Sequence, residues 1–242
     1  KAPIVFDMDV EWESDGVTAS DIWYEDGRWH MFYVAMGAGW CYAVSDDCYS
    51  WTRPEVGEVE YNGSKNNNIR ADHPEGQIWE DPSAPPEERF KAMGAGSGWY
   101  DPDTWEKLES EEAEKRWDAM HYEGAAYDGP KVVLRGWLVG WTSPDRRKGW
   151  KKIEKPLADY SVNGGICPGY DAHNKTYFAY IQPQGCAPVD PQSMGASIVE
   201  TEVVRRAVGL TRTKDFRHWP AAKLLIHPDA QDPLDTSFYG AC

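Results

Sequence analysis

A short unit recurs three times in this chain, and it constrains the fold more than any other feature. Each copy runs from a strand-like stretch, through a turn that contains Asp, to a Trp that opens the next strand. The copies are Tyr42-Ala43-Val44-Ser45-Asp46 with Trp51, Gly140-Trp141-Thr142-Ser143-Pro144-Asp145 with Trp150, and Val208-Gly209-Leu210-Thr211-Arg212 with Asp215 and Trp219. Self-similar units are typical of architectures in which each unit packs on its neighbours. An Asp carboxylate can bind turn N–H groups, and a Trp ring provides a large packing surface. The repeat therefore predicts a β-propeller, whose blades are four-stranded sheets around a channel.

The spacing of the units predicts a single all-β domain over residues 1–242, with about three four-stranded antiparallel blades and the start of a fourth. The blades are expected at 16–62, 76–157 and 163–227, and the fourth begins at 234–242. A segment rich in Glu, Lys and Ala interrupts the second unit and predicts a surface helix over 103–120, with Asp103 as its N-cap. A closed propeller joins its first and last blades. We therefore expect missing sequence or an additional chain to complete the ring.

Charge and hydropathy narrow the classes of partner. The net charge is −15 and the isoelectric point is near 4.8, with no basic stripe along the sequence. Such a surface disfavours nucleic acid and anionic membranes as partners. No apolar run approaches the ~18 residues that a membrane helix needs.

Cysteine and histidine patterns give no sign of a metal or cofactor site. The five Cys residues contain no CxxC pair, and the six His residues contain no HExxH spacing. Phosphate loops, nucleophile elbows and dinucleotide fingerprints are also absent from the sequence. Cys41 and Cys48 flank the first repeated turn, where a disulfide between them is one possibility. Two glycosylation sequons begin at Asn62 and Asn174, and an extracellular or periplasmic location is slightly favoured over a cytoplasmic one.

Several longer motifs resemble a known superfamily. They are DGRWHMFY at 26–33, WTRP at 51–54, VEYNGSKNNNI at 59–69, DPSAPPEERFK at 81–91, RAVG at 206–209 with DFRHW at 215–219, and DAQDPLDTSFY at 229–239. Together they resemble the five-bladed propellers of glycoside hydrolase families 43 and 32. The resemblance covers nearly the whole chain apart from the expected helix.

This resemblance implies a carbohydrate substrate and carboxylate acid/base chemistry at the propeller axis. Glycoside cleavage uses one protonated carboxyl group and one ionised carboxylate, and burial and mutual repulsion separate the pKa values of such a pair. The acids expected on innermost strands are Asp21, Asp81 and Asp235. The expected substrate contacts are Trp23, Trp79, Asn163 and Tyr239, of which the two Trp rings would stack on a sugar.

Each of the predicted catalytic acids also has a purely structural interpretation. Asp81 precedes Pro82 and could cap a turn, Asp21 could be a solvated strand residue, and Asp235 fits an ordinary Asp-Thr turn. The repeated Asp46, Asp145 and Asp215 are expected to be structural, and the repeated Trp residues to lie in the core. Because a fold does not fix a function, a non-catalytic propeller that binds carbohydrate or protein is the alternative to a glycoside hydrolase.

Overall fold

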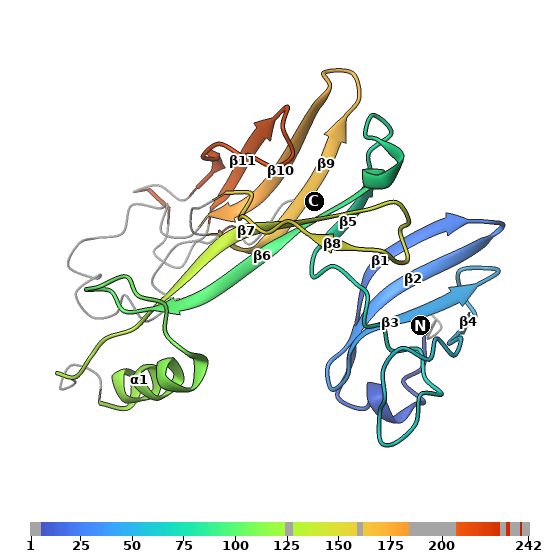
Figure 1. Ribbon diagram of the computed structural model, residues 1–242, viewed down its shortest axis with the longest axis horizontal. Coiled ribbons are helices and arrows are strands. Elements are labelled where there is room, and N and C mark those ends of the chain that lie inside the picture. The colour runs from blue at the N-terminus through green and yellow to red at the C-terminus, as the bar shows by residue number, and fades with distance from the viewer. Residues whose placement is uncertain are drawn as a thin grey trace.

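Three four-stranded sheets follow one another along the chain in the computed structural model (Figure 1). The structure describes residues 6–123, 128–158, 162–183, 207–227, 231–232 and 238. Sheet 1 contains β1 (Val17–Glu25), β2 (Arg28–Ala35), β3 (Gly39–Ser45) and β4 (Trp51–Thr52). Sheet 2 contains β5 (Gln77–Glu80), β6 (Phe90–Tyr100), β7 (Val133–Ser143) and β8 (Lys151–Lys152). Sheet 3 contains β9 (Val162–Asp171), β10 (Thr176–Pro183), β11 (Val208–Thr213) and β12 (Lys223–Ile226).

The strands of each sheet pair antiparallel with their neighbours in chain order. The remaining elements are two 3₁₀ turns, at Glu11–Glu13 and Pro86–Glu88, and the helix α1 (Ser110–Glu123). The mostly-β fold and the four-stranded antiparallel units expected from the repeat are therefore confirmed. The described residues form no closed ring of sheets, so the number of five blades stays a prediction.

The third and fourth strands of every sheet are joined by the same side-chain arrangement. A hydroxyl oxygen at the end of the third strand accepts the N–H of an Asp two residues later. The pairs are Ser45–Asp47, Ser143–Asp145 and Thr213–Asp215, with O···N distances of 3.2, 3.1 and 3.0 Å. The Asp carboxylate then accepts the N–H two residues further on, at 2.8, 2.7 and 2.9 Å. Local bonds of this kind stabilise the turn.

This arrangement corrects one residue of the repeat. Asp46 was expected to be the turn acid of the first copy, but Asp47 holds that place because it lies two residues after Ser45. Asp46 is exposed and forms an ion pair with Arg28 at 3.1 Å.

Two apolar layers join the sheets. Between sheets 1 and 2, Phe32 and Tyr42 pack with Ile78 and Trp141. Between sheets 2 and 3, the core contains Met93, Leu138, Tyr177, Ala179 and Ile181. A third cluster covers the other face of sheet 1. The repeated Trp51, Trp150 and Trp219 each pack on a different one of these three clusters.

The helix begins later than the sequence suggested. Helix α1 starts at Ser110 rather than at Asp103, and it lies beyond the far end of the β6–β7 hairpin (Figure 1). The carboxylate of Asp101 accepts the N–H groups of Asp103 and Thr104 at 2.9 and 3.1 Å, and Trp105 has a φ of +59°. That left-handed residue interrupts a right-handed helix. Within the described residues, no helix is long and apolar enough to cross a bilayer.

The possible disulfide in the first repeated turn is not formed. Cys41 is buried in β3, whereas Cys48 lies in the turn with a φ of +64°, and both are free thiols.

Candidate functional site

Asp21 lies at an irregularity in β1 that faces sheet 2. The pairing of β1 with β2 shifts between Ala19 and Asp21, so that Ala19 is opposite Tyr33 and Asp21 is opposite Phe32. A bulge of this kind bends a strand and redirects a side chain. The Asp21 side chain is 18% exposed, and its Oδ2 lies 3.4 Å from Nε of Arg146, which lies in the second repeated turn.

The environment of Asp21 favours its protonated form. Burial raises the pKa of Asp21, and the positive charge of Arg146 only partly opposes this effect. Neither Asp21 Oδ2 nor Arg146 Nε has a hydrogen-bond partner among the described residues, although both atoms are buried. Buried polar atoms without partners are uncommon and call for an explanation. A carboxyl group with a raised pKa next to a guanidinium whose Nε lacks a hydrogen-bond partner is an arrangement that occurs at functional sites.

A pocket of about 240 Å³ lies beside this pair, between the β1–β2 hairpin and sheet 2. We call it the inter-sheet pocket; its walls include Trp23, Tyr24, Glu25, Glu80, Arg89 and Arg146. The guanidinium of Arg146 lies 5.1 Å from the ring centre of Trp23. Arg146 therefore contacts both Asp21 and the aromatic wall of the pocket. Sequence reasoning missed Arg146; the available signal was a pair of adjacent Arg residues directly after a repeated turn in an acidic chain.

Asp81 lies at a different inter-sheet contact, the one between sheets 2 and 3. Its side chain is fully buried, and Oδ1 accepts hydrogen bonds from N and Oγ of Ser83 at 3.0 and 2.6 Å. Oδ2 accepts the hydroxyl of Tyr177 at 2.5 Å and lies 3.5 Å from Nζ of Lys91. Burial opposes ionisation, but these hydrogen bonds and the Lys91 charge outweigh it and lower the pKa of Asp81. This placement agrees with the alternative in which Asp81 caps a turn.

The other predicted site residues are dispersed. Trp23 lines the inter-sheet pocket, is 7% exposed, and donates its Nε1–H to Glu25 Oε2 at 3.4 Å. Trp79 packs edge-on against Phe216 at 5.6 Å in the core between sheets 2 and 3. Asn163 pairs with Gln182 across β9 and β10. Asp235 and Tyr239 lie outside the described residues. The structure therefore brings Asp21 and Trp23 to one inter-sheet contact and places Asp81 and Trp79 at the other.

The described part of the chain holds no cluster of three or more His, Cys, Asp or Glu side chains suited to a metal ion.

Comparison with known proteins gives structural likenesses only. No family model matches the sequence, and no curated protein matches it. Among solved structures, the chain is similar to the GH32 β-fructofuranosidase BmSUC1 of Bombyx mori, with 13% identity and a TM-score of 0.42 over 88% of this chain and 35% of that one. It is also similar to a thermostable family-43 glycoside hydrolase, with 12% identity and a TM-score of 0.45 over 89% of this chain and 55% of that one. The chain thus spans between about a third and just over half the length of these two structures. Its structural neighbours include members of glycoside hydrolase families 32 and 43, the families that the sequence motifs resemble.

Proposed function

We propose that the chain is part of a five-bladed glycoside hydrolase-like propeller that processes a poly- or oligosaccharide by carboxylate acid/base catalysis. The observation that carries this proposal is the environment of Asp21. Its pKa is raised by burial, and one of its carboxylate oxygens has no hydrogen-bond partner among the described residues. These are the properties required of the acid that protonates a glycosidic oxygen.

In this proposal, Asp21 gives its proton to the oxygen of the leaving group. The second carboxylate, which stays ionised, either attacks the anomeric carbon or activates a water molecule. Asp235 is our candidate for that role. Asp81 instead holds sheet 2 against sheet 3, since its oxygens are already occupied by Ser83 and Tyr177. Trp23 provides an apolar wall for a sugar ring in the inter-sheet pocket.

The test is hydrolysis by the Asp21→Asn variant. Wild-type protein is assayed on 4-nitrophenyl pentosides and hexosides, on sucrose, and on arabinan, xylan and levan, with release of nitrophenol or reducing sugar as the readout. We expect Asp21→Asn to lower kcat/KM by about 10²–10⁴-fold. Asp118→Asn is the matched control, because Asp118 is exposed and the same chemical group is replaced. Hydrolysis by Asp21→Asn at the control rate would overturn the role of Asp21.

A non-catalytic propeller that binds carbohydrate is the second candidate. One observation favours it: Asp81, one of the acids expected to react, has no exposed surface in this structure. This candidate predicts binding of at least one of the same glycans, with no product released by wild-type protein.

A further inference from the structure

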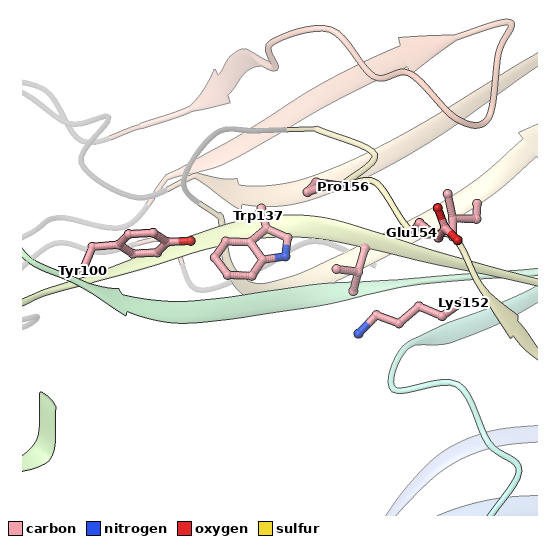
Figure 2. A pocket seen from close by; sticks show the side chains of 7 residues that line it. Tyr100, Trp137, Lys152, Glu154 and Pro156 are labelled. Carbon is pink, nitrogen blue, oxygen red and sulfur yellow. The ribbon is translucent and has the colours of Figure 1, made fainter. Parts of the chain in front are cut away.

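A second hollow, on the face of sheet 2 that looks toward sheet 1, is unrelated to the inter-sheet pocket. It has a volume of about 310 Å³, at the lower end of the range of about 300–1,000 Å³ for small-molecule sites. Its walls include Tyr100, Trp137, Val139, Lys152, Glu154 and Pro156, and we call it the Trp137 groove (Figure 2). The two hollows share no lining residue.

The floor of the Trp137 groove is an indole ring laid across glycines. Trp137 on β7 is paired with Gly96 on β6. A Cβ at Gly96 would lie 2.5 Å from Nε1 of Trp137, and a Cβ at Gly98 would lie 3.0 Å from its Cη2. The indole therefore covers the positions that two side chains would otherwise fill. Because its inner face rests on the strand and Trp137 is only half-buried, the ring keeps a free surface toward the groove.

Neighbouring side chains hold the Trp137 indole in position. Val139, which also lines the groove, is 6% exposed and belongs to the core between sheets 1 and 2. Tyr100 contacts Trp137 edge-on, with ring centres 6.4 Å apart and an interplanar angle of 79°. Sites built on strands with packed supporting side chains keep their geometry better than sites on loops.

The rim carries hydrogen-bonding groups of both charges. Lys152 and Glu154 are exposed and line the groove on the side of β8, as Figure 2 shows. The Lys152 ammonium lies 5.4 Å from the ring centre of Trp141. One positive and one negative side chain give no net charge, so the groove suits a neutral ligand with hydroxyl groups. Flat anionic ligands such as nucleotides are disfavoured by the net charge of −15.

We infer that the Trp137 groove binds a neutral sugar ring of a glycan, at a place separate from the site of Asp21. The apolar face of the ring stacks on the indole, and its hydroxyl groups bind Lys152, Glu154 and the Tyr100 hydroxyl. The choice of a glycan as the ligand rests on the proposed function. The groove would then hold the polymer on the protein while another part of it reaches the inter-sheet pocket.

Electrophoresis through native gels that contain arabinan, arabinoxylan, levan or mixed-linkage β-glucan tests this inference. We expect at least one polymer to retard the wild-type protein, and Trp137→Ala to weaken that binding about tenfold. Trp105→Ala is the control, because Trp105 is 58% exposed and does not line the groove. The double variant Lys152→Met/Glu154→Gln changes only exposed side chains and should weaken binding without loss of folding.

The outcomes separate this inference from the proposed function. Absence of retardation by all four polymers would overturn it, as would equal binding by wild type and Trp137→Ala. If Trp137→Ala fails to fold, equal binding by wild type and the Lys152/Glu154 double variant would overturn it. Retardation of Asp21→Asn to the wild-type extent is expected even where its hydrolysis is lost. Retardation of a wild-type protein that hydrolyses nothing would support the groove and contradict the catalytic proposal.

Discussion

The hydroxyl group of Tyr177 donates a hydrogen bond of 2.5 Å to Oδ2 of Asp81, and so connects β10 of sheet 3 to the turn that follows β5 in sheet 2. Lys91 lies 3.5 Å from the same oxygen and is 2% exposed. A polar cluster thus crosses the apolar contact between sheets 2 and 3.

Replacing Tyr177 with Phe removes the donor and leaves the buried carboxylate with one partner fewer. We expect Tyr177→Phe to lower the free energy of unfolding by about 1.5–3 kcal/mol, the range for hydrogen bonds to charged groups. Urea denaturation at pH 7 measures this loss. Tyr49→Phe is the control, because Tyr49 is 67% exposed; equal losses in the two variants would contradict the assignment.

The same bond affects acid unfolding. The pKa of Asp81 is lowered in the folded protein, so its stabilisation is present above the unfolded value of 3.8 and is lost as the pH falls through the folded value. Without Tyr177 the folded pKa rises toward the unfolded one. We therefore expect acid unfolding of Tyr177→Phe to begin at a higher pH than that of wild type, which circular dichroism follows. An unchanged midpoint would show that Tyr177 does not stabilise the ionised carboxylate.

Asp81 and Lys91 form a buried pair whose members depend on each other. We expect Asp81→Ala to destabilise the protein by about 3–5 kcal/mol, because the buried Lys91 then keeps only the more distant Glu88 carboxylate, at 3.8 Å, as its counter-charge. The double variant Asp81→Ala/Lys91→Met should recover part of this loss. A double-mutant cycle by urea denaturation measures the coupling, and strictly additive losses would mean that the pair is not coupled.

Asp21 should make stability depend on pH in the opposite direction. Its folded pKa is raised, so the protonated group contributes stability that is complete below 3.8 and is lost as the pH rises through the folded value. We expect wild type to lose stability relative to Asp21→Asn over that rise. Urea denaturation of both proteins between pH 4 and pH 8 tests this, and parallel curves would contradict it.

Two glycines of β6 should respond differently to the same substitution. A Cβ at Gly94 would lie 2.1 Å from the backbone oxygen of Glu75, whereas one at Gly96 would meet the Trp137 side chain at 2.5 Å. A side chain can move more easily than a backbone. We therefore expect Gly94→Ala to cost about 3 kcal/mol and Gly96→Ala about 1 kcal/mol. Thermal unfolding compares them, and the reverse order would contradict the packing described.

The repeat allowed the sheets to be predicted because its signals are local. Alternating strands and Asp turns lie within a few residues of each other, and the strand-like stretch of the first copy, from Tyr42 to Ser45, lies within β3. Asp47 was missed because two adjacent Asp residues satisfy the same pattern, and only the hydrogen bonds distinguish them. The helix start was misplaced because the Asp101 turn and the left-handed Trp105 were not visible in composition.

The site was harder to predict because its contacts are distant in sequence. Arg146 approaches Asp21, and Tyr177 binds Asp81, each from another sheet. Nothing in the local pattern of Asp81-Pro82-Ser83 separates an acid that reacts from one that is buried beneath its partners. That difference depends on how the sheets pack.

The order of the sheets also has a consequence for how the protein unfolds. Among the described residues, sheet 2 contributes to two inter-sheet cores, whereas sheets 1 and 3 each share one core with it. Coupling in such an array passes between nearest neighbours, as in repeat proteins. Sheet 2 is therefore the central member through which damage in one outer sheet must pass to affect the other. Local opening of sheet 1 or sheet 3 leaves one core intact, but opening of sheet 2 disrupts both cores, so its amides should exchange with solvent last.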